Sequence, residues 1–151
     1  MGVYVSSEFV TEVQAILKSN AHADCEKGII DSIFTKSIDE IKNSGCKRLG
    51  GDPNKSPFLR KRIETTHAGK SSGYRLYFWL LVSEGNVYLL FIHPKTGRKS
   101  GSNLTVEKQK ELVATFTNCR KDGTFLSVEL DTKIYKIVYS AKKKEDRQNV
   151  F

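Results

Sequence analysis

The stretch from residue 58 to residue 99 constrains the fold most strongly, because it reads as three consecutive strands. Runs of apolar and aromatic residues predict strands over Phe58 to Glu64, Tyr74 to Val82 and Val87 to His93. A Gly/Ser-rich connection joins the first two, and the turn-forming residues 83–86 join the last two. The two later runs are apolar on both faces, which is typical of strands in the centre of a covered sheet.

Most of the net positive charge of the chain lies in this stretch and the three residues before it. Between Lys55 and Lys99 there are nine Lys or Arg residues and two acidic ones, a net charge of +7 out of +8 for all 151 residues. Concentrated Lys and Arg side chains attract phosphate at long range, and binding releases counterions. The charge therefore indicates a polyanionic partner, with an ordinary solvated basic surface as the alternative.

The overall composition predicts a single globular domain in the cytoplasm, with 38% hydrophobic and 28% charged residues. The longest apolar run, Leu76 to Val82, is too short to cross a bilayer, and the first ten residues lack the features of a secretory signal. Cys25, Cys46 and Cys119 are odd in number and widely spaced, so we expect free thiols rather than a disulfide framework or a zinc site. No other metal or cofactor is expected.

The residues before the central stretch predict two helices and a loop. Ser6 or Ser7 can cap a helix with an apolar stripe from Phe9 to Leu17, and a second helix is predicted from about Asp24 to Asn43. Two adjacent amphipathic helices should pack as a hairpin against the sheet. The Gly and Pro residues of the segment 47–57 predict a loop.

After the central stretch, Thr105 can cap a last helix whose Leu112, Val113 and Phe116 should face inward. Residues 125–130 and 134–139 predict a small hairpin that extends the sheet or covers its edge. The final residues, 142–151, predict a frayed or helical tail.

Four short motifs follow one another in the order and spacing of a known family. They are Leu59-Arg60-Lys61, Gly69 to Arg75, Val87 to Leu90, and Asn103-Leu104-Thr105. Together with the order strand, two helices, three antiparallel strands, helix, these motifs resemble the RelE-like toxins of bacterial type II toxin–antitoxin modules, including their HigB-type branch. The resemblance covers residues 3–117 and is strongest from 58 to 106.

The resemblance implies an α+β fold of the RelE/ParE type, in which an N-terminal strand and a helical hairpin pack on a small antiparallel sheet. A C-terminal helix and an appended β segment and tail would follow. We assign residues 1–117 to the toxin domain and residues 118–151 to a C-terminal extension packed on the same domain. The family also implies a ribosome-dependent endoribonuclease that cuts messenger RNA in the decoding site and is held inactive by a cognate antitoxin, in a hetero-oligomer with it.

RNA cleavage that uses the neighbouring 2′-hydroxyl as nucleophile needs a base, a group that stabilises the charged phosphorane, and an acid for the leaving oxygen. Arg75 is the best candidate for the phosphate, because its planar fork can hold two phosphate oxygens. Lys70 could be the base or a second clamp, and Lys95 and Arg98 could supply an acid or hold the backbone. The further RNA-binding candidates are Arg60, Lys61, Arg62, Lys99 and His93.

One feature departs from the family pattern. Many members carry a catalytic tyrosine shortly after the last strand, but residues 96–104 contain none, so the general acid or base stays unassigned. Tyr74, Tyr77, Trp79 and Tyr88 are better explained as packing residues, although one of them could stack on a base. Two alternatives stay open: a ParE-like toxin that poisons DNA gyrase without nuclease activity, and a basic RNA-binding module without catalysis.

Overall fold

The computed structural model describes residues 1–18, 24–64, 73–94 and 104–144. Its elements, in chain order, are β1 (Gly2–Val5), α1 (Ser7–Leu17), α2 (Cys25–Ile29), the π-helix η2 (Ile30–Phe34), α3 (Ile38–Lys42), β2 (Lys47–Asp52), β3 (Ser56–Glu64), β4 (Gly73–Leu81), β5 (Asn86–Pro94), α4 (Val106–Asp122), β6 (Leu126–Asp131) and β7 (Lys136–Lys144). The three strands expected between residues 58 and 93 are confirmed as β3, β4 and β5.

All the strands form one seven-stranded sheet in the order β2-β3-β4-β5-β1-β6-β7. The α+β class is confirmed. The expectation of a small antiparallel sheet is wrong, because β1 pairs in parallel with β5 and the β6–β7 hairpin adds two more strands beside β1. This hairpin covers an edge of β1 that would otherwise expose unpaired backbone groups.

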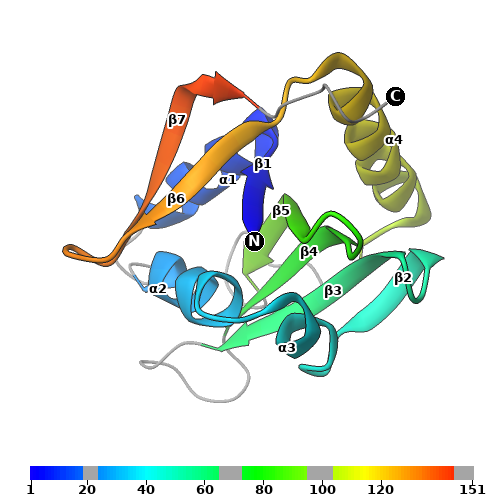
Figure 1. The fold of residues 1–151 in the computed structure, drawn as a ribbon, viewed down its shortest axis with the longest axis horizontal. Helices are drawn as coiled ribbons and strands as arrows, with labels where there is room; N and C mark the ends of the chain where they lie inside the picture. The colour runs from blue at the N-terminus through cyan, green and yellow to red at the C-terminus, as the bar shows by residue number, and fades with distance from the viewer. Residues whose placement is uncertain (19–23, 65–72, 95–103, 145–151) are drawn as a thin grey trace.

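The sheet, drawn in Figure 1, separates two apolar cores, one on each of its faces. Along β4, Leu76, Phe78 and Leu80 point to the side of α1, α2 and η2, whereas Tyr77 and Trp79 point to the side of α4. The alternation follows from the strand period of two. A bulge in the β4–β5 pairing, after Tyr77, shifts the register by one residue.

The first predicted helix is confirmed as α1, capped by the Ser6 hydroxyl oxygen, which accepts a hydrogen bond from Phe9 N at 3.1 Å. The expected single helix from Asp24 to Asn43 is wrong, because it is broken into α2, η2 and α3. The break occurs at Ser37, where Ser37 and Glu40 form a reciprocal capping box that starts α3 as a new helix.

The loop expected over residues 47–57 is also wrong. Residues Lys47–Asp52 form β2, which pairs antiparallel with β3 and forms one edge of the sheet. Gly51 adopts the left-handed conformation, with φ of 72°, and the Asp52 carboxylate accepts backbone hydrogen bonds from Asn54 and Lys55 in the turn that follows. Glycine and proline here shape an irregular hairpin, where the sequence pattern alone predicts a loop.

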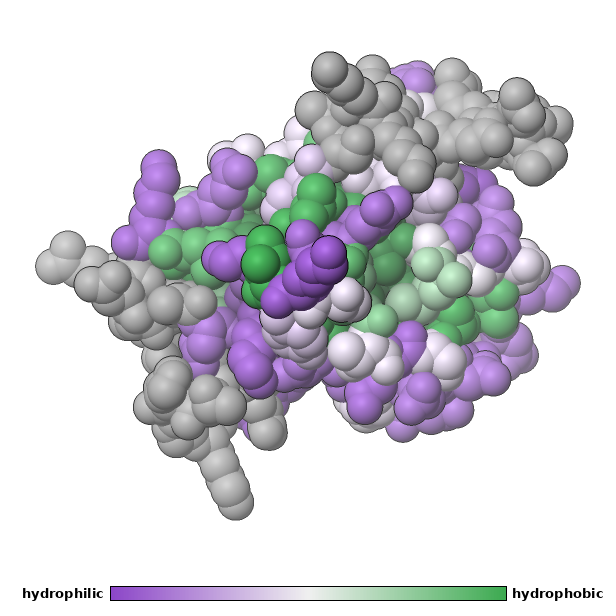
Figure 2. Space-filling view, turned by 60° about the vertical axis from the view of Figure 1, so that its left-hand side comes forward, coloured by the Kyte–Doolittle hydropathy of each residue, from purple (hydrophilic) through white to green (hydrophobic). Residues whose placement is uncertain are grey.

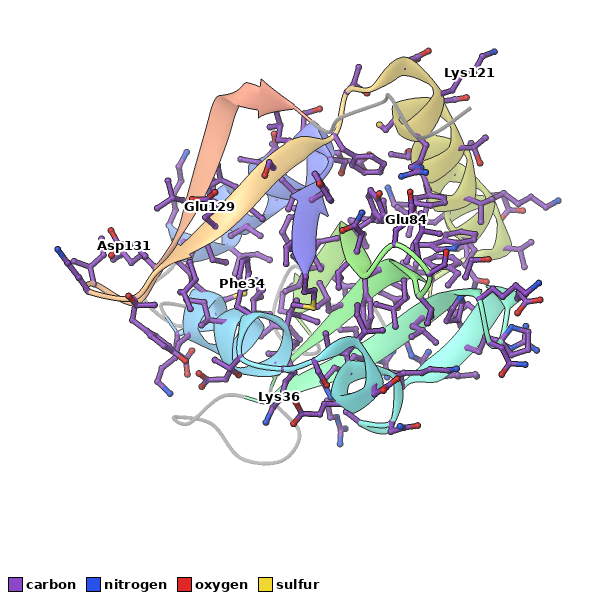
Figure 3. The ribbon with its side chains drawn as sticks, viewed as in Figure 1. Phe34, Lys36, Glu84, Lys121, Glu129 and Asp131 are labelled. Atoms are coloured by element: carbon purple, nitrogen blue, oxygen red, sulfur yellow. The ribbon has the colours of Figure 1, made fainter. Side chains whose placement is uncertain are left out.

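The last predicted helix is confirmed as α4. The helix continues to Asp122, beyond the last residue of its apolar pattern, Phe116. Gly123, in the left-handed conformation, caps its C-terminus. Leu112 and Phe116 are buried as expected, but Val113 is 38% exposed, so the expectation that it faces inward is wrong. Glu84, in the turn between β4 and β5, lies beside α4 (Figure 3), with its Oε1 3.3 Å from Arg120 Nη2.

The hairpin predicted near the C-terminus is confirmed as β6 and β7, and it extends the sheet. Residues 142–144 belong to β7, so the tail expected there is wrong for these residues, and residues 145–151 lie outside the described residues. Figure 2, in which the β6–β7 side is turned forward, shows apolar and hydrophilic surface mixed on that side. Ile134 and Val138 are among the exposed apolar residues of this hairpin.

Candidate nucleic-acid interface

The strand register brings four of the predicted site residues onto one face of the sheet. Arg62 on β3 lies opposite Arg75 on β4, and Arg75 lies opposite His93 on β5. Arg60 is opposite Tyr77 in the next row. Directly opposed residues of antiparallel strands place their side chains on the same face, and Tyr77 marks this face as the side of α4.

This arrangement places like charges against one another. Arg62 and Arg75 are cross-strand neighbours, and like charges directly opposite destabilise a sheet. Arg62 is exposed and Arg60 and Arg75 are partly buried, so all three retain access to solvent. A bound anion would relieve the repulsion between these arginines, and the guanidinium fork suits phosphate oxygens in particular.

A buried Tyr–His pair lies within this cluster. Tyr77 Oη is 3.3 Å from His93 Nε2, and His93 Nδ1 is 3.1 Å from the Pro94 carbonyl oxygen. Because a carbonyl only accepts, Nδ1 carries the proton and Nε2 of the neutral ring accepts the Tyr77 hydroxyl. The two rings also stack, with centroids 5.7 Å apart.

The environment holds both members of this pair neutral. Burial lowers the pKa of His93 below its usual value and the charges of Arg75 and Arg60 lower it too, against the hydrogen bond to Pro94. Burial raises the pKa of Tyr77, while the charges of Arg60 and Arg75 and hydrogen bonds from them oppose that shift. Tyr77 therefore connects His93 with both arginines.

The exposure of the pair limits what it can do directly. Tyr77 is 1% exposed and His93 is 7% exposed, so little of either ring is available to touch RNA. The geometry suits them to hold the Arg60 and Arg75 side chains in place rather than to react with a substrate. We therefore treat them as positioning residues.

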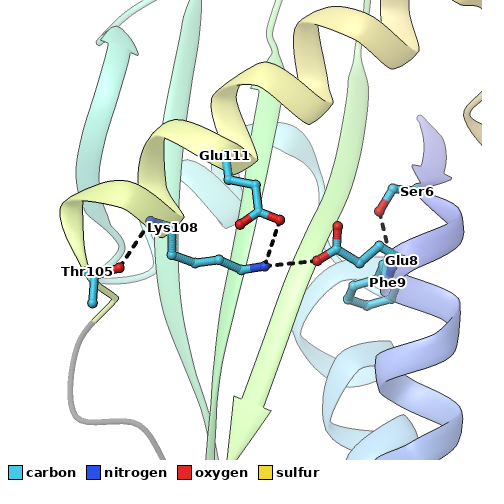
Figure 4. A network of polar contacts seen from close by, with 6 residues as sticks. All are labelled: Ser6, Glu8, Phe9, Thr105, Lys108 and Glu111. Atoms are coloured by element: carbon cyan, nitrogen blue, oxygen red, sulfur yellow. Dashed lines mark hydrogen bonds and ion pairs between the residues drawn. The ribbon is translucent and has the colours of Figure 1, made fainter.

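Lysine 108 of α4 adds one more positive charge above the same face. Its Nζ lies 4.6 Å from the centroid of the Phe91 ring. The same Nζ is 2.9 Å from Glu8 Oε1 and 3.5 Å from Glu111 Oε1 (Figure 4). Burial disfavours the charged amine, but the hydrogen bond and charge of Glu8, followed by those of Glu111, outweigh it and raise the pKa of Lys108. This contact ties the first turn of α4 to the first turn of α1.

The structure does not bring Lys61 to this face. Its neighbours Arg60 and Arg62 point to the α4 side, so Lys61 points to the other side, where Nζ donates to Ser44 O at 3.1 Å and to Ser44 Oγ at 2.8 Å. Lys61 lines a polar pocket of about 420 Å³ there, and Arg62, near the end of β3, also borders this pocket. Among the sequence-predicted residues, Lys70, Lys95, Arg98 and Lys99 lie outside the described residues.

Sequence reasoning missed the roles of Tyr77 and Lys108. Tyr77 was assigned to packing, although its position two residues after Arg75 on one strand places both on one face. Lys108 carries no local signal, because its contacts with Glu8 and Phe91 come from segments far away in the chain.

No protein-family model, curated protein or solved structure compared with the chain matches it. Within the described residues, no three His, Cys, Asp or Glu side chains are grouped so that they could hold a metal ion. Within the same residues, every helix is too short or too polar to pass through a lipid bilayer.

Proposed function

We propose that the chain is a RelE-like toxin of a type II toxin–antitoxin module that cleaves messenger RNA on the ribosome. The observation that carries the proposal is the row Arg62, Arg75 and His93 across three neighbouring strands, with Arg60 and Tyr77 in the next row. Like charges directly opposite each other destabilise a sheet, so a phosphate bound between Arg62 and Arg75 would offset this cost. The order of elements from β1 to α4 supports the same family, apart from the extra strand β2.

In the proposed reaction the 2′-hydroxyl of one nucleotide attacks the adjacent phosphate, and the 5′-oxygen leaves. Arg75, with Arg60 beside it, holds the phosphate oxygens and stabilises the charge of the phosphorane. Arg62, the most exposed of the three, contacts the RNA backbone. Tyr77 and His93 position Arg60 and Arg75, while Lys70, Lys95 and Arg98 are the candidates for proton transfer.

The partners in this proposal are the ribosome with its messenger RNA, and an antitoxin that neutralises the basic face. Charge complementarity favours an acidic antitoxin segment, because the face carries Arg60, Arg62 and Arg75 together. The proposed location is the cytoplasm, where ribosomes and antitoxin are present.

The test is inducible expression in bacteria of the wild type, Arg75→Ala and Lys61→Ala, with primer extension on a reporter message and a gyrase supercoiling assay. Lys61→Ala is the matched control, because it removes a basic residue of the same sheet from the opposite face. We expect cuts in translated message with the wild type and Lys61→Ala, and loss of at least about 100-fold in Arg75→Ala, the order found on removing one charge-stabilising donor.

Two outcomes would overturn the proposal. Growth arrest with intact message and inhibited supercoiling would assign the chain to the gyrase poisons. Absence of both effects in a folded, soluble protein would leave a basic RNA-binding module. Equal loss of cutting in Lys61→Ala and Arg75→Ala would contradict the assignment of the α4 face as the active face.

A further inference from the structure

A groove lies on the α4 side of the sheet, at the opposite end of the strands from the arginine row. It has a volume of about 350 Å³ and lies between the edge strand β2 and helix α4. Phe58 and Trp79 form its floor, and Leu49, Val106 and Val113 are among its walls. Trp79 follows Arg75 by four residues on β4, about 13 Å along the strand, and Phe58 precedes Arg60 by two residues on β3, about 7 Å.

The floor of the groove has an unsatisfied hydrogen-bond donor. Trp79 is 9% exposed, and its Nε1 has no acceptor among the described residues. The indole lies parallel to two rings, Phe58 at 5.1 Å and Phe116 at 4.4 Å. The Cζ2 edge of the indole, next to Nε1, lies toward Gly51 of β2, where an ideal Cβ would be 3.2 Å away from it.

The walls of the groove expose apolar side chains. Val106 is 63% exposed and Val113 is 38% exposed, and both lie on the face of α4 that lines the groove. Burial of exposed apolar surface drives association, and these are the only two large apolar residues of α4 among the described residues that are exposed.

The strand beside the groove is an edge. β2 is the outermost strand of the sheet, and within the described residues it pairs with β3 alone. Edge strands accept an added strand through their free backbone groups, while neighbouring pockets take alternate side chains. Edge and groove together therefore suit an extended polypeptide.

The charge around the groove selects among possible occupants. Lys47 and Arg48 on β2 and Lys110 on the α4 wall are all exposed. A second copy of the chain docked edge to edge would bring Lys47 and Arg48 close to their own counterparts, which repel. Lys110 lines the groove and Lys47, opposite Arg60, lies on the same face of the sheet, so these two side chains attract an acidic segment.

We propose that this groove binds an extended segment of a partner protein in which apolar residues alternate with acidic ones. The segment adds to the edge strand β2 and places an apolar side chain between Val106 and Val113. The acidic residues contact Lys47 and Lys110. The proposal does not depend on nuclease activity, because no arginine of the candidate interface takes part.

The chain contains a single tryptophan, so its fluorescence reports on the groove directly. The probe is a capped synthetic peptide of about seven residues, the length of a typical strand, that alternates valine with aspartate. A peptide of the same length that alternates valine with lysine is the charge control. Titration of the whole protein is followed by tryptophan fluorescence and by calorimetry.

We expect the acidic peptide to bind and to change the tryptophan fluorescence, and the basic peptide not to bind. Val113→Asp should weaken the acidic peptide at least about tenfold. The matched control Val138→Asp alters an exposed valine on β7, the opposite edge strand of the sheet, and should leave binding unchanged.

Three results would overturn the inference. The first is absence of binding at millimolar peptide with a folded protein, and the second is equal binding of the acidic and basic peptides. The third is a concentration-dependent dimer, measured by light scattering, that Val113→Asp abolishes, because it would show that a second copy covers the groove. Circular dichroism of each variant checks that the fold is retained.

Discussion

Tyr77 Oη and His93 Nε2 lie 3.3 Å apart, and they join two neighbouring rows of the sheet through one buried hydrogen bond. Tyr77 is opposite Arg60 and His93 is opposite Arg75. The pair therefore lies between the two arginines that we place on the scissile phosphate. Its neutral state is a condition for this arrangement, since a charged imidazolium would repel both guanidinium groups.

We expect the stability of the protein to fall as the pH is lowered from 7.5 to about 5.5. The pKa of His93 in the folded state is below its usual value of 6.5, so the unfolded chain binds more protons once the pH falls below about 6.5. The free energy of unfolding stops decreasing once the pH is below the pKa of His93 in the folded protein. Urea unfolding at several pH values measures the effect, and few carboxylates titrate in this range.

The control for this prediction is His93→Gln. The variant should be less stable at pH 7.5, because Tyr77 loses its acceptor, but its stability should change less between pH 7.5 and 5.5. An identical pH slope in both proteins would show that His93 does not cause the dependence.

Gly51→Ala should destabilise the protein, whereas Gly50→Ala should be tolerated. Gly51 has φ of 72°, and a Cβ there would overlap the Ser56 carbonyl oxygen across the β2–β3 hairpin. The left-handed backbone alone costs about 1–2 kcal/mol for alanine. At Gly50 a Cβ meets nothing within 4 Å, so a change within about 0.5 kcal/mol is expected. Thermal unfolding measures the stability of both variants. An equal loss of stability in the two would contradict the backbone conformation of Gly51 in β2.

The contact between Lys108 and Glu8 should contribute a measurable coupling energy. A double-mutant cycle of Lys108→Met and Glu8→Gln is expected to give about 0.5–1 kcal/mol, because the two side chains are only 24% and 36% exposed. The exposed pair Lys27–Asp31 is the comparison, with about 0.3–0.5 kcal/mol expected for its (i,i+4) spacing. Added salt should reduce the second value more than the first. A coupling near zero for Lys108 and Glu8 would mean that this ion pair does not help to hold α4 against α1.

Cys25 should resist thiol reagents until the protein unfolds. Burial, followed by the charges of Asp24 and Glu26, raises the pKa of Cys25 to about 12, so almost no thiolate exists at pH 8. Cys25 is 0% exposed, whereas Cys46 and Cys119 are partly exposed. Labelling with iodoacetamide, followed by peptide mass spectrometry, should modify Cys25 last. Native labelling of Cys25 as fast as Cys119 would show that this core opens locally.

The strands that sequence predicts well here are those whose signal is local. The run from Tyr74 to Val82 and the run from Val87 to His93 flank a turn rich in Gly, Asn and Ser, so both strands and their pairing follow from adjacent residues. The loop expected at residues 47–57 fails for the opposite reason. Gly50 and Gly51 are compatible with a loop and also with an irregular edge strand. Only the pairing with β3 distinguishes these two structures.

The break in the second helix shows a conflict between two local signals. The apolar spacing of Ile30, Ile33, Ile38 and Ile41 continues through the segment, but Ser37 and Glu40 also match a capping box. The cap prevails, because α3 turns away to cover a different part of the sheet and contributes Ile41 to the core. Spacing alone could not rank the two signals.

The candidate site was only partly accessible from sequence. Arg75 stands out in the sequence because it begins a rigid strand. The alternation of side chains along a strand places Arg75 on the other face of the sheet from Leu76. The alignment of Arg62 with Arg75 and His93 depends on the register of three strands, and a bulge after Tyr77 shifts that register within β4 and β5. A bulge carries no reliable local signature, so the row is visible only in the folded sheet.

The placement of β1 in the sheet affects how the protein can fold during its synthesis. The four residues of β1 leave the ribosome before their partners, which are β5, about 85 residues later, and β6, about 125 residues later. The sheet therefore cannot be completed around β1 until β6 has emerged from the ribosome. Such distant pairing slows folding. The basic face, by contrast, lies on β3, β4 and β5, which follow one another in the chain, so it can form before β6 completes the sheet around β1.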